Sequence, residues 1–470
     1  MVAAALIAAA HRRANLREAM TLGGAAATFL SILPFVEPVL AGERPRLVLG
    51  EMMPGLALVL ELEPLGLLFA LIASGLWLVS GVYSIGYMRG NNEEHQTRFY
   101  VCFALAIASA IGVALAGNLL TLYLFYEALT LITWPLVTHH GDAEAQRGGR
   151  TYLGVLLASS LLFLLPAMAA TWWLSGTLDF RPGGILAGHA SSGAAAGLLA
   201  LYAFGIGKAA LMPIHRWLPA AMVAPTPVSA LLHAVAVVKA GVFSIVKVVV
   251  YVFGLDFGAE AFTWLTWVAG FTIVAASIVA LRADNLKRRL AYSTVSQLSY
   301  VVLAAAVLTP LSVMGAVLHI AAHSVSKITL FFAAGAIYTA AHKTNVSQLD
   351  GIGRRMPVTM GAFAVGALSL MGIPPSAGFV SKWYIVQGAF SAELVLPAIV
   401  LLASTLLNAA YFMPIVYTAF FRAPAASDPV HGEAPWPSVL ALAVTAGLTV
   451  ALFFVPGLPL SLAAALVGRP

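Results

Sequence analysis

The sequence predicts an all-α membrane protein with about fourteen transmembrane helices, the first of them short. Of the 470 residues, 61% are hydrophobic and 9% are charged, whereas a soluble domain carries about 25% charged residues. Apolar stretches of about 20 residues, the length of one spanning helix, follow one another along the chain. Charged residues gather in the short connections, and basic connections alternate with neutral or acidic ones.

The first apolar segment, Val2–Ala10, is shorter than a membrane span. Its nine residues would rise about 14 Å as a helix, roughly half of the hydrocarbon core. No charged leader precedes it and no cleavage site ends it, unlike a signal peptide. We expect either a half-length span or a first helix whose beginning is missing from this sequence.

Further spans follow within one transmembrane domain, residues 1–470. They are expected at residues 19–39, 65–88, 97–116, 118–138, 151–174, 195–213, 225–254, 262–281, 289–308, 312–340, 358–384, 389–421 and 437–465. The longest connection, residues 41–63, is expected to be a charged loop.

The basic connections predict the orientation of the protein. They carry Arg12, Arg13, Arg17, Arg89, Arg98, Arg147, Arg150, Arg216, Arg282, Lys287, Arg288, Arg289, Lys343, Arg354, Arg355 and Arg422. By the positive-inside rule these connections face the cytoplasm, here across a prokaryotic inner membrane. The loop histidines His139, His140 and His342 are expected to be merely solvated.

Composition excludes several classes of function. Cys102 is the only cysteine, so the chain forms no internal disulfide and holds no iron–sulfur cluster with its own thiolates. The net charge of +6 is spread over short connections, which argues against nucleic-acid binding. No flavin, quinone or nucleotide motif is present, so we expect no cofactor and no catalytic chemistry of its own.

Glu127 and Lys208 lie within apolar runs, residues 118–137 and 195–211. A charge at the bilayer centre costs roughly 2.5–3.5 kcal/mol on insertion scales, so such residues usually mark an ion or proton path. Burial lowers the pKa of a lysine and a nearby carboxylate raises it. A changing Glu127–Lys208 distance would therefore let the lysine hold and release a proton, unless the two form a static ion pair that fixes helix packing.

Two spans are interrupted by proline. Pro213 and Pro225, together with Pro219 and Pro227, fall within a short stretch, and Pro374 and Pro375 interrupt a later span before Lys382. A discontinuous helix at membrane depth normally lines a cavity or water path. Kinks used only for packing are the alternative.

One predicted helix carries His319, His323 and Lys327 at spacings i, i+4 and i+8 on a single face. Histidine both donates and accepts, so this face can relay protons. No Asp, Glu or Cys on the helix completes a metal site, so no metal is expected. His233 and Lys239 flank the same interior. Interhelical hydrogen bonding alone would be the structural alternative.

Four segments resemble the antiporter-like subunits of complex I and of Mrp cation/proton antiporters. They are KAALMPIHRWLPAAMVAPTPVSALLHAVAVVKAG (Lys208–Gly241), DNLKRRLAYSTVSQLSY (Asp284–Tyr300), HIAAHSVSKITLFFAAGAI (His319–Ile337) and GIPPSAGFVSKW (Gly372–Trp383). The resemblance covers nearly the whole chain after Leu65, and pieces such as VVKAG are most similar to L-type and Mrp A-type members.

The resemblance implies fourteen helices with two inverted five-helix repeats, which we place at residues 97–254 and 262–421. It implies that Glu127 modulates a central lysine, Lys208, and that Lys382 is the terminal lysine near the exit. His233 and the face of His319, His323 and Lys327 would form a hydrophilic axis between them. The chain departs from the family at Glu63-Pro64-Leu65-Gly66, where Asp-x-Leu-Ser is usual, and at Lys247, where many relatives have Arg.

We therefore expect a proton-translocating subunit of an Mrp-type antiporter or a complex I-like respiratory or hydrogenase complex, such as an NADH-quinone oxidoreductase-type translocase. Its partners would be sister membrane subunits and lipid. Transport of Na+ or K+ is left open, because acidic groups in the spans are scarce. Two alternatives are a subunit coupling ion flow to inorganic carbon uptake with a soluble partner, and a non-conducting scaffold.

Overall fold

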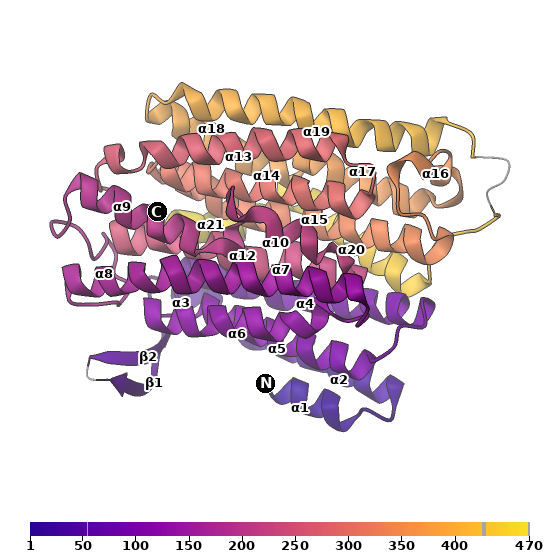
Figure 1. Cartoon of the computed structure of the whole chain (residues 1–470), viewed down its shortest axis with the longest axis horizontal. Helices are drawn as coiled ribbons and strands as arrows, with labels where there is room; N and C mark the ends of the chain where they lie inside the picture. The colour runs from indigo at the N-terminus through magenta and orange to yellow at the C-terminus, as the bar shows by residue number, and fades with distance from the viewer. Residues whose placement is uncertain (54, 425–428, 469–470) are drawn as a thin grey trace.

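The chain folds into helices that run roughly parallel to one another (Figure 1). The computed structural model describes residues 1–53, 55–424 and 429–468; short 3₁₀ or π-helical segments are labelled η. Residues 1–175 form α1 Val2–Ala9, α2 Ala14–Ile32, η1 Leu33–Phe35, α3 Val36–Leu40, β1 Arg46–Met53, β2 Leu56–Glu61, α4 Pro64–Gly90, α5 Gln96–Ala114, α6 Leu119–Val137, α7 Ala143–Ser159, η2 Ser160–Leu164 and α8 Leu165–Ser175. Residues 192–306 form α9 Ser192–Gly205, η3 Gly207–Ala209, η4 Ile214–Arg216, α10 Trp217–Ala220, η5 Ala221–Val223, α11 Thr226–Ala230, η6 Leu231–Val235, α12 Val237–Val248, η7 Val249–Phe253, η8 Ala259–Ala261, α13 Thr263–Arg282 and α14 Leu286–Ala306. The remainder forms α15 Pro310–Ala341, η9 Val346–Gln348, α16 Ile352–Arg355, α17 Pro357–Met371, α18 Ala377–Ser391, α19 Val395–Phe421, α20 Trp436–Phe454 and α21 Gly457–Leu466.

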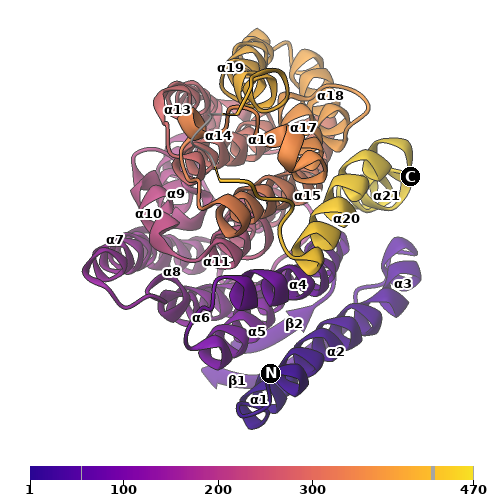
Figure 2. The same ribbon diagram turned by 90° about the vertical axis from the view of Figure 1, so that its right-hand side faces the viewer.

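Two segments form the centre of the bundle. Every residue is buried in the most apolar 18-residue window of Thr226–Phe253, which runs from α11 to η7, and in that of α15. The end view in Figure 2 places α11 and α15 between α4 to α6 on one side and α13, α14 and α17 on the other. Among the described residues, ten helices are long and apolar enough to cross a membrane, as expected for a polytopic membrane protein.

Side-chain caps begin several helices. The Glu63 carboxylate accepts hydrogen bonds from two backbone N–H groups at the start of α4. Asn118, Asp142 and Asn285 each accept one at the starts of α6, α7 and α14. These bonds satisfy N–H groups that lack a partner within the helix, and they fix where each helix starts.

The helical path breaks at two places. The first break follows Gly205 at the end of α9 and continues through η3, η4, α10 and η5; Pro213 precedes η4 and Pro225 precedes α11. The second break separates α17 from α18 and contains Pro374 and Pro375. Proline has no N–H to continue the helical ladder, so both breaks leave backbone carbonyls free to bind other groups.

Three details of the expected spans are wrong. Residues 41–63 do not form a loop throughout, because β1 and β2 pair as an antiparallel hairpin in which Arg46 lies opposite Glu61. The expected span 195–213 ends at Gly205, before the first break. The expected span 437–465 divides into α20 and α21 at Pro456, which cannot donate to the helical ladder.

Candidate functional site

Lys208 is buried in η3, directly after α9, with its ammonium turned toward α6. Its Nζ donates to the Tyr126 carbonyl at 2.8 Å and to the Thr130 hydroxyl at 2.5 Å. The same Nζ lies 3.1 Å from the centroid of the Tyr126 ring. On the other side, Gly241 of α12 packs so closely that a Cβ there would lie 2.3 Å from the Lys208 backbone. The lysine is thus held between α6 and α12.

Glu127 does not form the expected direct ion pair with Lys208. Both of its carboxylate oxygens are buried, and neither accepts a hydrogen bond from a described residue. Instead, Tyr126 contributes its backbone carbonyl and Thr130, one turn further along α6, contributes its hydroxyl. A carbonyl and a hydroxyl therefore occupy the positions around the ammonium that the carboxylate was expected to take.

Lys239 of α12 contacts His323 of α15, Nζ against Nδ1, and both side chains are buried. Two unit charges 4 Å apart repel by about 4 kcal/mol at an effective dielectric constant of 20. The contact is therefore stable only when one partner is neutral, with the other donating the shared proton. His323 Nε2 has no partner among the described residues, so it can exchange a proton on its far side.

His233 lies on the π-helical turn η6, beside α15. Its ring centroid is 4.7 Å from that of Phe331, and neither ring nitrogen has a hydrogen-bond partner among the described residues. Buried polar groups are normally satisfied by protein or ordered water. Both ring nitrogens of this histidine are therefore available for a hydrogen bond that the described residues do not supply.

The remaining polar residues of α15 each contact a different helix. His319 Nδ1 lies 2.9 Å from the Ser381 hydroxyl of α18, and its ring stacks on Tyr300 at 5.3 Å. Lys327 Nζ donates to the Ser293 hydroxyl of α14 at 2.9 Å. The face of α15 that carries these residues is thus surrounded by hydroxyl groups.

Lys382 of α18 is held at the second helix break. Its Nζ donates to the carbonyls of Leu370 and Met371, both at 2.9 Å, and to the Thr405 hydroxyl at 3.2 Å. The last carbonyls of a helix carry partial negative charge and bind cations favourably. The same Nζ lies 5.0 Å from the Tyr300 ring, the ring on which His319 stacks.

We call these residues the polar axis: Lys208, His233, Lys239, His319, His323, Lys327 and Lys382. The structure brings Lys239, His323 and His319 together directly, and Tyr300 joins His319 to Lys382. Sequence reasoning missed the hydroxyl partners Thr130, Ser293 and Ser381. Serine and threonine are too common in such helices to be singled out by pattern.

A buried ion pair outside the polar axis was also missed. Lys247 Nζ lies 3.3 Å from the Glu63 carboxylate, and the Tyr251 hydroxyl donates to the same carboxylate at 2.9 Å. Lys247 also donates to the Ala116 carbonyl at 2.7 Å. Glu63 and Lys247 both lie where the sequence departs from the family pattern. This shared departure was the signal in the sequence that the two residues belong together.

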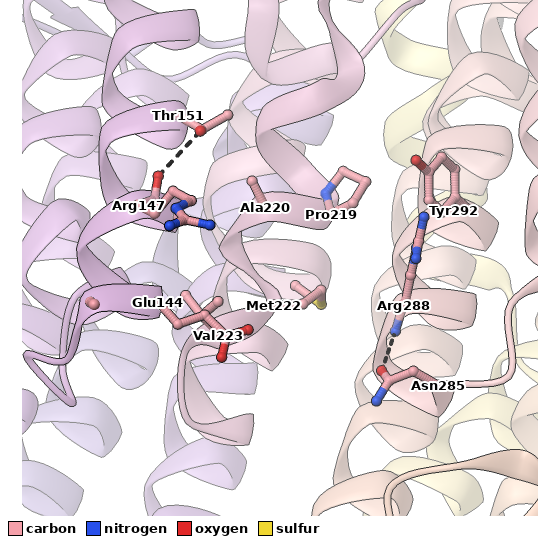
Figure 3. A pocket seen from close by; sticks show the side chains of 12 residues that line it. Glu144, Arg147, Thr151, Pro219, Ala220, Met222, Val223, Asn285, Arg288 and Tyr292 are labelled. Carbon is pink, nitrogen blue, oxygen red and sulfur yellow. Dashed lines mark hydrogen bonds between the residues drawn. The ribbon is translucent and has the colours of Figure 1, made fainter.

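A cavity of about 800 Å³ opens between α7, η5 and α14. Figure 3 shows its charged lining, with Glu144 and Arg147 on one wall and Arg288 and Tyr292 on the other. None of the polar-axis residues lines it. This cavity is therefore separate from the polar axis.

A family model described as NADH:quinone oxidoreductase/Mrp antiporter, transmembrane, matches residues 116–408. The matched range is more than half of the chain and contains Glu127 and the whole polar axis. The chain belongs to the NADH:quinone oxidoreductase/Mrp antiporter family. The resemblance expected from the four sequence segments is therefore confirmed.

Curated relatives come from several kinds of complex within this family. NADH-quinone oxidoreductase subunit N of Desulforudis audaxviator is 33% identical over 390 residues, covering 82% of this chain and 77% of the relative. A probable K(+)/H(+) antiporter component of Rhizobium meliloti is 30% identical over 81% of this chain, and hydrogenase-4 component B of Escherichia coli is 31% identical over 72%. The chain spans only 38% and 52% of the lengths of these last two proteins.

Solved structures of the family share the fold. The Mrp complex from Dietzia sp. DQ12-45-1b contains a chain that matches with a TM-score of 0.89 at 21% identity, covering 99% of this chain and 95% of that one. The membrane-bound sulfane sulfur reductase, an archaeal respiratory membrane complex, matches with a TM-score of 0.86 at 22% identity and covers 99% and 96%. These relatives are subunits of multi-subunit membrane complexes.

Proposed function

We propose that this chain is a proton-translocating subunit of a multi-subunit membrane complex of the Mrp antiporter or complex I type. The contact between Lys239 and His323 carries the proposal. It joins two buried bases from different central helices, and repulsion between two buried positive charges disfavours the pair with both partners charged. A proton passing between the partners would cross a single contact.

The remaining polar axis extends this pair in both directions. Lys208 leads toward Glu127 of α6, and His319 leads through Tyr300 toward Lys382. The side chains of the axis are buried, so all of them cannot be charged together without a large desolvation cost. Protons would therefore move along the axis as each base is charged and neutralised in turn.

Glu127 would control the central lysine. Its carboxylate lies on the same turn of α6 as the two groups that bind the Lys208 ammonium. A small rotation of α6 or of η3 would exchange the hydroxyl and carbonyl partners of the ammonium for the carboxylate. The lysine would hold its proton near Glu127 and release it when the distance increases.

The proposed architecture contains fourteen spans and two inverted repeats, residues 97–254 and 262–421. Lys239 then belongs to the first repeat and His323 to the second, so their contact joins the two halves. The basic connections would face the cytoplasm of a prokaryotic cell.

Proton movement by the whole complex in membrane vesicles tests this function. Lys208→Ala should lower the rate by about 100-fold, the size of a typical contribution from a positioned proton-transfer group. Arg282→Ala removes an exposed basic side chain at the end of α13 and should leave the rate unchanged. An assembled Lys208→Ala complex that pumps at the normal rate would favour the non-conducting scaffold.

A further inference from the structure

A carboxylate and two imidazoles form a cluster outside the polar axis, at the end of the bundle that carries the arginine- and lysine-rich connections. The Glu93 carboxylate, after α4, lies 3.3 Å from His140 Nε2 and 3.9 Å from His139 Nε2, both between α6 and α7. Side-chain exposure falls from 39% for His140 to 11% for Glu93 and 2% for His139. The cluster therefore leads from solvent into the protein. His139 was expected to be solvated, and its burial contradicts that expectation.

Two adjoining cavities open at this cluster. Both are lined by Glu93, His140 and Tyr338; the outer one measures about 520 Å³ and the inner one about 230 Å³. The inner cavity is large enough for several waters, since one water occupies about 30 Å³ of liquid. Lys287 lines its wall and donates to the Ala224 carbonyl at 2.5 Å, just before α11.

The inner cavity reaches almost to the polar axis. Ala334 of α15 lines it, and Phe331 lies one turn further along the same helix, about 4.5 Å away. The Phe331 ring is the one that packs against His233. Ala334 and Phe331, on adjacent turns of α15, therefore connect the wall of the inner cavity to this unpartnered histidine.

We propose that Glu93, His139 and His140 form the proton-collecting site that supplies His233 through the inner cavity. This inference rests on the proposed function. A proton from bulk water would bind one ring nitrogen of His140 while the other nitrogen releases a proton to Glu93. Glu93 would pass that proton to water in the inner cavity and so to His233. One proton enters and one proton leaves at each step, so charge and atoms balance.

The surrounding charges favour collection at His140. The carboxylate of Glu93 raises the pKa of His140 through their hydrogen bond, whereas burial lowers the pKa of His139 to about 4. Asp142 also raises the pKa of His140 and Lys287 lowers it, so the net rise makes His140 bind a proton more readily than the buried His139 does. The other titratable or charged groups lining the two cavities are Tyr87, Glu94, His95, Arg98, Lys287, Tyr338, His342 and Lys343.

The proposal is tested by proton uptake from the side of the membrane that carries the arginine- and lysine-rich connections. Uptake is measured at pH 6 and pH 8 in vesicles that contain the whole complex. Glu93→Gln should slow uptake several-fold at pH 8, because His140 then loses its proton at a lower pH. The defect should shrink at pH 6, where bulk protons are abundant. Glu144→Gln, the same change at an exposed residue of α7 that lines neither cavity, should behave like the parent protein.

The same measurements separate this inference from the proposed function. Lys208→Ala should block uptake at both pH values. If it does and Glu93→Gln still matches Glu144→Gln at pH 8, the collecting site is wrong and the function stands. If Lys208→Ala conducts normally, the function fails as well. If the complex with Glu93→Gln does not assemble, His140→Gln, at the more exposed position, replaces it in the test. This variant should show the same pH-dependent loss of uptake. Normal uptake by the His140→Gln complex would overturn the proposal.

Discussion

Lys239 Nζ and His323 Nδ1 are in direct contact, and no described carboxylate forms an ion pair with either group. A buried base in contact with another base is costly when both are charged. The pair is therefore most stable with a single shared proton. This relationship links α12 to α15, the two central helical segments of the bundle.

The coupling within this pair should be visible in a double-mutant cycle. His323→Ala and Lys239→Ala should each lower proton movement strongly, and combining them should add little, because either change alone breaks the same transfer step. Rates measured in vesicles with the intact complex give the coupling. If the fold losses in rate of the two single variants multiply in the double variant, the two residues act on separate steps.

Replacement of the carboxylate on α6 should slow transport without abolishing assembly. Glu127→Gln keeps the size of the side chain and removes the charge that would hold a proton on Lys208. We expect a rate loss of about tenfold or more, with Glu127→Asp retaining part of the activity. Normal rates in Glu127→Gln would mean that the Tyr126 and Thr130 contacts alone govern Lys208.

The ion pair between Glu63 and Lys247 should stabilise the fold without carrying protons. Breaking a buried pair leaves one charge uncompensated, so Lys247→Met should destabilise the protein by about 3–5 kcal/mol. The double change Glu63→Gln with Lys247→Met removes both charges and keeps an acceptor oxygen at the start of α4, so it should recover most of that loss. Thermal unfolding of the detergent-purified protein checks this. Equal stability of the single and double variants would contradict it.

Stability should fall in acid partly because of His139. Its pKa is lowered to about 4 in the folded protein because burial outweighs the attraction of Glu93, whereas an unfolded histidine titrates near 6.5. Between these values the unfolded chain binds more protons, so stability is full above about pH 6.5 and falls toward pH 4. His139→Gln should flatten the pH dependence of the unfolding temperature over this range. If the pH dependence of the unfolding temperature is unchanged in this variant, groups other than His139 cause the loss of stability in acid.

The sequence predicted most helices well, because hydrophobic length is a local property. The expected spans 65–88 and 312–340 lie within two residues of α4 and α15 at both ends. The hairpin of β1 and β2 was missed because its apolar runs, residues 47–49 and 56–60, are short and are flanked by Arg46, Glu51 and Glu61, which are typical of a charged loop. Pairing between strands is a non-local property that periodicity alone does not reveal.

The site was predictable in its residue types but not in its contacts. Lys208, Lys239 and His323 were recognisable because ionisable groups in apolar spans are rare. The partners of the Lys208 ammonium were not recognisable from the sequence, because the path of η3 decides which face of α6 the ammonium contacts. The proximity of Glu63 and Lys247, far apart in sequence, likewise depends on the packing of α4 against α12.

Proton flux through the assembled complex carrying Lys239→Ala is the decisive measurement for a relay through the polar axis. The complex is purified, its sister subunits are checked for full occupancy, and pH change is recorded in sealed vesicles. A relay that passes through Lys239 predicts that flux falls by about 100-fold while assembly is retained. Flux at the parent rate through a fully assembled Lys239→Ala complex would contradict it.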